Sequence, residues 1–106
     1  AYTTAKHAIN GMTKSVAREV GTEGVTVNAI CPGLIVTDIL QTNGPKTAEA
    51  MGMTLDEMID YFTSESAIKR PNKAEEVAAV ALLLASEAGA GITGTQLSVD
   101  GGTAQY

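Results

Sequence analysis

An amphipathic helical segment followed closely by a short β-branched segment constrains the fold of this chain more than any other feature. Apolar side chains recur at spacings of three and four between residues 2 and 20, which predicts one long helix. They are Ala5, Ile9, Met12, Val16 and Val20. Gly21 offers a stop for this helix, and Val25–Ile30 has the composition of a buried strand that Pro32-Gly33 ends sharply. A helix, a tight turn and a buried strand in this order indicate an α/β unit.

The segment from Thr37 to Arg70 is less regular, and we interpret it as a mobile segment that covers a substrate. Asn43-Gly44-Pro45 predicts a turn, and Thr54-x-x-Glu57 is typical of a capping box. The apolar residues that follow at helical spacing are Leu55, Met58, Ile59 and Phe62. Methionines interrupted by glycine favour a lid, and the alternative is a surface pair of helices with an apolar underside.

The last third of the chain predicts one more helix and one more strand. Asn72-x-x-Glu75 predicts the cap of a helix that ends at Gly89. The expected buried stripe of this helix comprises Val77, Val80, Ala81, Leu83, Leu84 and Ala88. Gln96–Val99 alternates polar and apolar residues, which predicts a final strand closed by a turn at residues 100–102.

Composition excludes several classes of protein. The 106 residues carry a formal net charge of -5 and no run of Lys or Arg, so we expect no nucleic-acid partner. The longest apolar run, Val77–Ala85, is too short to span a membrane. Cys31 is the only cysteine, so no internal disulfide can form and a reducing cytoplasm is the expected location. No spacing of Cys and His predicts a metal site.

Two short patterns carry chemistry. Tyr2 and Lys6 lie four positions apart and so share one helix face, where the ammonium would favour the charged form of the phenol. Residues 32–37 follow a buried strand, and α/β folds bind ligands at the carboxyl ends of such strands. Other candidates are interpreted as surface or packing residues: His7, Cys31, Asp56, Glu57, Asp60, Glu75 and Glu76.

The patterns in combination resemble the C-terminal part of the classical short-chain dehydrogenase/reductase family. A Y-x-x-x-K helix is followed in order by V-N-A-x-x-P-G-x-x-x-T, R-P-x-x-x-E-E-V-A and I-T-G-x-x-L-x-V-D-G-G. These motifs occupy Tyr2–Lys6, Val27–Thr37, Arg70–Ala78 and Ile92–Gly102, so the resemblance covers nearly the entire chain. It implies an α/β fold in which residues 1–106 supply the last two strands and flanking helices of a doubly wound, parallel Rossmann sheet. The chain would be the C-terminal part of a single NAD(P)-binding domain, with a substrate-loop insertion at about residues 38–70.

The resemblance implies hydride transfer between NAD or NADP and a secondary alcohol or ketone. Tyr2 would be the general acid/base, and Lys6 would bind the nicotinamide ribose and lower the pKa of Tyr2. Ile35, through its backbone, and Thr37, through its side chain, would hold the nicotinamide carboxamide. Pro32 and Gly33 would shape the turn beside the nicotinamide ring. Asn28 would serve structure near the strand end, and Cys31 would line the same region.

The family's glycine-rich T-G-x-x-x-G-x-G turn and its catalytic serine do not occur in this sequence. We therefore expect these 106 residues alone not to catalyse hydride transfer. The closing residues 99–102 and the Arg70-Pro71 pair resemble those of 3-oxoacyl carrier-protein reductases and 3-hydroxybutyrate dehydrogenases, which implies a small carbonyl or alcohol substrate such as a 3-oxoacyl thioester or a 3-hydroxy acid. Sugar and polyol dehydrogenases share these motifs and are an alternative. A further alternative is a non-catalytic, truncated module retained by self-assembly. The family also implies a homo-oligomer, either a dimer or a tetramer.

Overall fold

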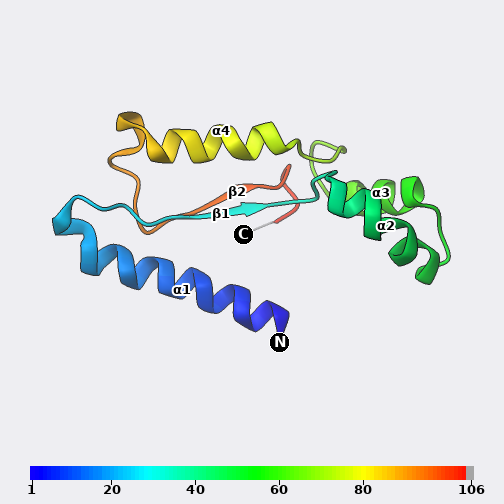
Figure 1. Cartoon of the computed structure of the whole chain (residues 1–106), viewed down its shortest axis with the longest axis horizontal. Coiled ribbons are helices and arrows are strands. Elements are labelled where there is room, and N and C mark those ends of the chain that lie inside the picture. The colour runs from blue at the N-terminus through cyan, green and yellow to red at the C-terminus, as the bar shows by residue number, and fades with distance from the viewer. Residues whose placement is uncertain (105–106) are drawn as a thin grey trace. The chain divides into compact units, whose positions relative to one another are not determined.

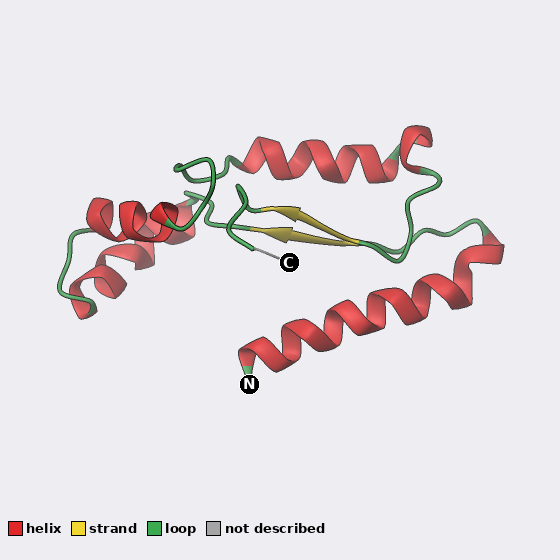
Figure 2. Ribbon diagram, turned by 180° about the vertical axis from the view of Figure 1, so that it is seen from behind, coloured by secondary structure: helices red, strands yellow, loops and turns green. Residues whose placement is uncertain are grey.

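The computed structural model describes residues 1–104, which form four α-helices and two β-strands (Figure 1). The elements are α1 (Tyr2–Val20), β1 (Ala29–Pro32), α2 (Asp38–Ala50), α3 (Leu55–Ser64), α4 (Ala74–Ala85) and β2 (Gln96–Val99). The two strands pair with each other and run parallel (Figure 2), so the predicted α/β class is confirmed. The chain divides into two compact units, one of residues 1–31 with 78–97 and one of residues 32–77 with those from 98 on.

Helix α1 has the predicted bounds, and Gly21 is its C-cap residue. Gly21 keeps a right-handed conformation, with φ -60° and ψ -36°, and opens a 3₁₀ turn over Gly21–Glu23. The left-handed residue is Gly24, whose φ is 76° and whose N–H donates to the carbonyl of Gly21. The predicted stop of the α-helix at Gly21 is therefore confirmed, although one tighter turn follows before Gly24 reverses the chain.

The buried face of α1 also differs from the predicted apolar stripe. Thr13 and Ala17 are its buried residues, whereas Ile9 and Met12 are exposed. Thr13 satisfies its hydroxyl by donating to the carbonyl of Ile9 at 2.9 Å. A Cβ placed on Gly94 would lie 3.4 Å from that of Ala17, so small residues let the loop before β2 approach the helix closely. This close contact has room only for small side chains, whereas the predicted stripe consists mainly of large ones.

The first strand lies later than the predicted Val25–Ile30. Before Ala29 the N–H of Val27 donates to the hydroxyl of Thr93 at 3.0 Å, and the carbonyl of Val27 accepts from the N–H of Gly94 at 2.7 Å. Asn28 donates to the carbonyl of Ile92 at 2.8 Å and accepts from the N–H of Thr95 at 3.3 Å. The regular strand begins at Ala29. Asn28 thus has a structural role through its side chain, but it lies just before the strand and not near its end, where the sequence interpretation places it.

Pro32 is the last residue of β1, so the predicted end of the strand at Pro32-Gly33 is confirmed. The N–H groups of Ala29 and Gly33 donate to the carbonyls of Thr95 and Val99, at 2.9 and 3.1 Å. Because alternate residues of a parallel strand bond to the same neighbour, the nitrogen of Pro32 faces the edge away from β2. A proline costs no ladder hydrogen bond there, so the strand can include it as its last residue.

The predicted turn at Asn43-Gly44-Pro45 is wrong, because these residues lie inside α2. Gly44 is buried, and a Cβ on it would come within 2.7 Å of the Cδ1 atom of Leu55 in α3. The glycine thus permits the close approach of two helices rather than a reversal of the chain. Pro45 removes one helical N–H, and packing of α2 on α3 keeps the helix intact across it.

Helix α3 begins as predicted. The hydroxyl of Thr54 accepts from the N–H of Glu57, and the Glu57 carboxylate accepts from the N–H of Thr54 at 2.8 Å, which completes the capping box. The centre of this second unit is formed by Ala48 of α2 and Met58 of α3, which are 1% and 3% exposed. These two helices occupy the segment that the sequence interpretation assigns to a substrate-covering insertion.

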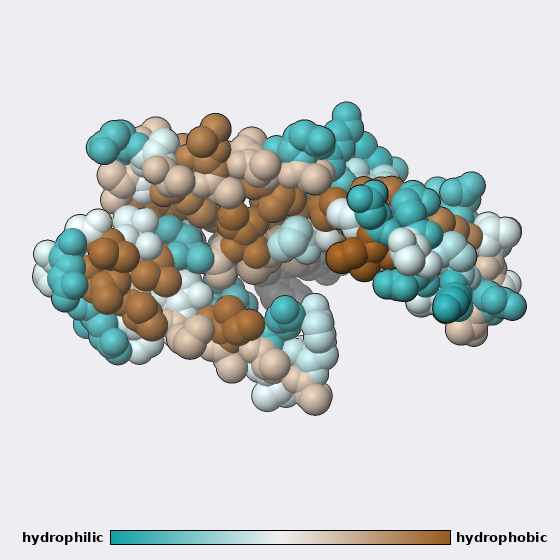
Figure 3. Space-filling view, viewed as in Figure 1, coloured by the Kyte–Doolittle hydropathy of each residue, from teal (hydrophilic) through white to brown (hydrophobic). Residues whose placement is uncertain are grey.

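Helix α4 begins two residues after the predicted cap and ends at Ala85, before a separate 3₁₀ turn over Glu87–Gly89. No residue of α4 is buried, so the predicted buried stripe is wrong. Leu82 is 72% exposed, and apolar side chains lie at the surface over α4 (Figure 3). Two described strands offer too narrow a surface to cover a helix of twelve residues.

Candidate cofactor and substrate site

The chain that leaves β1 presents free backbone groups at Ile35. Ile35 forms a parallel bridge with Asn72, in which the N–H of Asn72 donates to the carbonyl of Leu34 at 2.9 Å. In such a bridge Asn72 bonds to the residues that flank Ile35, so the N–H and C=O of Ile35 itself point away from Asn72. Neither group of Ile35 makes a hydrogen bond within residues 1–104. Ile35 therefore offers one donor and one acceptor to a ligand.

Thr37 adds a hydroxyl at the start of α2. It occupies the N-cap position with extended backbone, and its side chain makes no capping hydrogen bond. Only its carbonyl is used, since it accepts from the N–H of Gln41 at 3.0 Å. The hydroxyl is exposed and can donate and accept at the positive end of the helix dipole.

Ile35 and Thr37 both line a cavity of about 370 Å³, which we call the α2 cavity. Its other lining residues are Leu34, Ile39, Leu40, Asn43, Gly44, Thr47, Met58 and Phe62. None of these side chains is ionisable, so the cavity suits a neutral group. A primary carboxamide needs an acceptor for its NH₂ and a donor for its oxygen, and Ile35 and Thr37 supply both. The residues at this cavity therefore fit the carboxamide end of a nicotinamide ring.

Gly33 and Pro32 contribute differently. A Cβ on Gly33 would lie 2.7 Å from the Cα of Asp100, so the ends of the two strands approach each other closely only because this residue is glycine. The Asp100 carboxylate accepts from the N–H groups of Ala104 and Gly102, both at 2.9 Å, and these bonds lower its pKa. Pro32 is exposed at the same turn.

Tyr2 and Lys6 lie together at the start of α1. The Lys6 ammonium nitrogen is 5.2 Å from the centroid of the Tyr2 ring, a cation–π distance. Tyr2 is 76% exposed, and its hydroxyl makes no hydrogen bond among the described residues. These two residues belong to the first unit, whereas residues 32–37 belong to the second. The structure thus pairs Tyr2 with Lys6 and, separately, Ile35 with Thr37.

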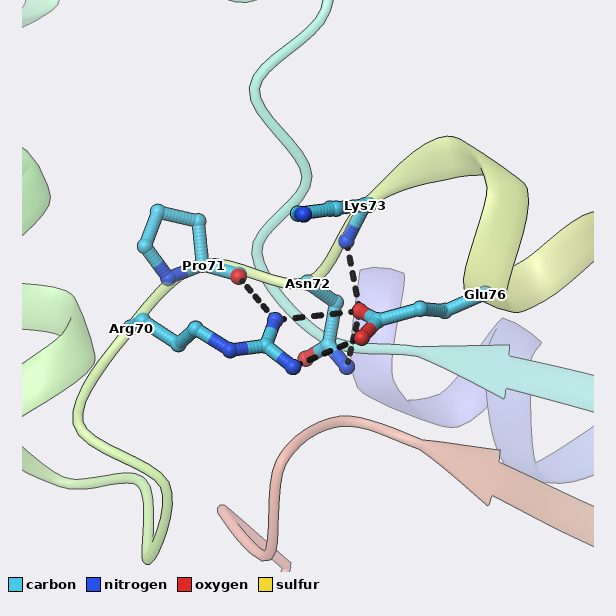
Figure 4. A network of polar contacts seen from close by, with 5 residues as sticks. All are labelled: Arg70, Pro71, Asn72, Lys73 and Glu76. Atoms are coloured by element: carbon cyan, nitrogen blue, oxygen red, sulfur yellow. Dashed lines mark hydrogen bonds and ion pairs between the residues drawn. The ribbon is translucent and has the colours of Figure 1, made fainter.

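The sequence interpretation missed a polar network at the start of α4 (Figure 4). The Arg70 guanidinium donates to both carboxylate oxygens of Glu76, at 2.6 and 3.1 Å. Glu76 also accepts from the N–H of Lys73 at 2.8 Å and from the side chain of Asn72 at 3.4 Å. Glu76, rather than the predicted Glu75, therefore caps the helix, and its signal in the sequence is an arginine and a glutamate six residues apart around Pro71.

The network shifts the titration of both charged groups. Hydrogen bonding to Arg70 lowers the pKa of Glu76 from 4.5 to about 2, helped by the N–H of Lys73, and the same contact raises the pKa of Arg70. A carboxyl whose folded-state pKa is depressed stabilises the fold above its ordinary pKa. We therefore expect this contribution to be complete above pH 4.5 and to disappear as the pH falls from 4.5 toward 2.

Glu76→Gln should remove this contribution to the stability of the fold at neutral pH. We expect a lower urea midpoint than in the parent protein at pH 7, with the difference shrinking steadily on acidification below pH 4.5. Glu75→Gln is the matched control, because Glu75 lies in the same first turn and its carboxylate makes no hydrogen bond in the described chain. Equal midpoints for the two variants at pH 7 would contradict the assigned role of Glu76.

The remaining candidates keep the ordinary roles that the sequence suggests. His7 is exposed, and its Nδ1 lies 2.9 Å from the carbonyl of Thr3 one turn earlier. Cys31 is half-buried in β1. Across residues 1–104, no three His, Cys, Asp or Glu side chains gather as metal ligands would. Within the same residues, every helix is too short or too polar to cross a membrane.

Comparison with known proteins places the chain in a family. A family model described as enoyl-(acyl carrier protein) reductase matches residues 1–104. The chain belongs to the short-chain dehydrogenase/reductase family. The expected resemblance to the C-terminal part of these enzymes is confirmed. The expected Rossmann-type fold is confirmed as well, because the similar solved structures have that fold.

Individual relatives agree with this assignment. D-beta-hydroxybutyrate dehydrogenase of Rhizobium meliloti (strain 1021) is 45% identical over 107 residues, which covers 99% of this chain and 42% of that protein. Sorbitol-6-phosphate 2-dehydrogenase SrlD from Erwinia amylovora matches with a TM-score of 0.88 at 30% identity, covering 99% and 41%. L-sorbose reductase from Gluconobacter frateurii, complexed with NADPH and L-sorbose, matches with a TM-score of 0.87 at 29% identity, covering 99% and 40%. The chain spans about two fifths of the length of these relatives.

Proposed function

We propose that this chain serves in an NAD(P)-dependent oxidoreductase that interconverts a secondary alcohol and a ketone. Family membership supports the reaction type, and the three relatives named above are dehydrogenases or reductases. The observation that carries the proposal is the α2 cavity, where Ile35 and Thr37 present an unpaired donor, an acceptor and a hydroxyl. This set complements a nicotinamide carboxamide. Residues 1–106 would be part of one NAD(P)-binding domain, with residues 38–70 as its substrate loop.

In this proposal NAD or NADP, when bound, supplies or accepts the hydride. The backbone of Ile35 and the hydroxyl of Thr37 hold the carboxamide, and Pro32 with Gly33 fixes the turn that presents them. Tyr2 donates a proton to the carbonyl oxygen during reduction and removes it during oxidation. Lys6 binds ribose hydroxyls, with its ammonium beside the ring of Tyr2.

The walls of the α2 cavity favour an aliphatic substrate over a polyol. Its side chains are mainly apolar and none is ionisable, so the many hydroxyls of a sugar would lose hydrogen bonds on entry. We therefore propose a 3-oxoacyl thioester, which is neutral. A 3-hydroxy acid, in keeping with the hydroxybutyrate dehydrogenase among the relatives, would have to keep its carboxylate outside the cavity. We further propose a homo-oligomer, which the exposed Ile9, Met12 and Leu82 support. A cytoplasmic location is proposed from the single cysteine. Since the family's glycine-rich turn and serine are not among these 106 residues, these residues alone would not turn over substrate.

Binding of NADH and NADPH tests the cofactor role directly. Thr37→Val keeps the side-chain volume but removes one hydrogen bond, and we expect a rise of up to about tenfold in the Kd of the preferred nucleotide. Kd would be measured by fluorescence titration of the purified protein that carries this chain. Thr42→Val is the control, because Thr42 is exposed on α2 and does not line the cavity.

This experiment tests the oxidoreductase function and the role of Thr37 separately. Lack of saturable binding of both nucleotides to the unmodified protein would reject the oxidoreductase proposal as a whole. Binding that is equal in Thr37→Val and Thr42→Val would leave the oxidoreductase but reject the role of Thr37.

A further inference from the structure

We propose that a second cavity beside the α2 cavity receives an apolar tail of the substrate, and that Phe62 sets the length of tail that fits. This inference rests on the proposed function, because it assumes that the reacting carbonyl lies in the α2 cavity. It adds a substrate class, a carbonyl compound with an unbranched apolar tail, and a residue that selects among its members.

The second cavity, which we call the α3 cavity, has a volume of about 290 Å³. It lies within the same compact unit as the α2 cavity and is lined by residues of the turn after β1, the end of α3 and the chain after β2. These include Gly33, Leu34, Phe62, Ser66, Asn72 and Thr103. An engineered apolar cavity of about 150 Å³ holds benzene, so the α3 cavity has room for a larger apolar group.

The polar side chains of the α3 cavity already have partners within the protein. Thr63 donates to the carbonyl of Ile59, and Ser66 donates to the carbonyl of Thr63. The hydroxyl of Thr103 donates to the carbonyl of Asp100, whose carboxylate accepts two backbone N–H groups. Arg70 is held by Glu76. Among the described residues no fully buried side-chain polar atom lacks a partner, and an apolar ligand costs none of these bonds.

Leu34 and Phe62 line both cavities and therefore separate them. Phe62 projects from α3 and remains 44% exposed, with the edge of its ring against Tyr61 at a centroid distance of 5.4 Å. A tail that extends from the α2 cavity must pass this ring to enter the α3 cavity. The size of the side chain at position 62 accordingly decides how far a tail can reach.

Calorimetric binding of straight-chain 3-oxoacyl thioesters of N-acetylcysteamine, from four to twelve carbons, tests the inference in the protein that carries this chain. In the unmodified protein, affinity should rise about fourfold for each buried methylene and then level off where the tail meets Phe62. Phe62→Ala should move this plateau to longer chains, with at least tenfold tighter binding of the longest thioester. Phe62→Trp should move it to shorter chains. Asp60→Ala is the control, because Asp60 is an exposed residue of the same helix and lines neither cavity.

Identical chain-length profiles for Phe62→Trp and the unmodified protein would overturn the inference, even if Phe62→Ala does not fold. An equal shift of the plateau in Asp60→Ala would overturn it as well. The binding of NADH and NADPH would be measured on the same proteins as the thioester titrations. Together the two measurements separate the tail site from the oxidoreductase function. A plateau that moves with residue 62 in a protein that binds neither nucleotide would support the tail site and reject the oxidoreductase function.

Discussion

Replacing Tyr2 by phenylalanine should lower kcat by about 10²- to 10⁴-fold, the range that general acid–base catalysis contributes. The substitution removes only a hydroxyl, and that hydroxyl makes no hydrogen bond in the described structure, so the stability of α1 should not change. The Lys6 ammonium lies over the ring face and can keep this contact with phenylalanine. A loss of activity would therefore report the missing proton donor rather than a disturbed helix.

Tyr61→Phe provides the control for this experiment, since it removes the same atom from another exposed tyrosine. Steady-state rates in both directions and the Kd of the preferred nucleotide would be measured for both variants. We expect Tyr61→Phe to retain the parent kcat and Tyr2→Phe to lose it with little change in nucleotide affinity. A fall of less than about threefold for Tyr2→Phe would remove Tyr2 from the chemistry.

Gly33→Ala should destabilise the fold by about 1–3 kcal/mol, the usual cost of forcing an extra carbon into a packed site. The new Cβ would lie 2.7 Å from the Cα of Asp100 and 3.0 Å from its carbonyl oxygen. Both are backbone atoms, which cannot rotate away as the end of a side chain can. The strand ends would have to separate, and the bond from the N–H of Gly33 to the carbonyl of Val99 would weaken. Urea unfolding of the purified protein measures this change.

Gly11→Ala makes the same chemical change where there is room for it. Gly11 lies inside α1 and no atom lies within 4 Å of a Cβ placed on it, so alanine should stabilise the helix by about 0.5–1 kcal/mol. The two variants should thus shift the urea midpoint in opposite directions. A Gly33→Ala protein as stable as the parent would mean that the strand ends tolerate separation, and would reject close approach as the reason for this glycine.

Elements governed by neighbouring residues could be predicted from the sequence. The bounds of α1 and β2 follow from hydrophobic spacing, and the capping box at Thr54 needs only Glu57 three residues later. Each of these signals acts over about one helical turn or one strand, so a single stretch of sequence contains all of it. Gly44-Pro45 shows the limit of such reading, because its local preference for a turn loses to the packing of α2 against α3.

The start of α4 shows the same limit for polar groups. Glu75 and Glu76 both suit the first turn of a helix, and local preference does not distinguish them. Glu76 caps the helix because the chain between Arg70 and Lys73 brings a guanidinium and a backbone N–H to its carboxylate. The bridge between Ile35 and Asn72 fixes that path, and it joins residues far apart in the sequence.

The family could be assigned from the sequence, because the order of Tyr2, Lys6 and the motif ending at Thr37 does not depend on how the chain folds. The sequence also determined the α/β class, since alternating and helical periodicities differ along the chain. Tertiary structure alone decided which groups are free to bind. The backbone groups of Ile35 are unpaired because Asn72 bonds to the residue before it, and Phe62 divides two cavities because α3 packs on α2. Both depend on close approach between distant residues, which is set by how the elements pack rather than by any local pattern.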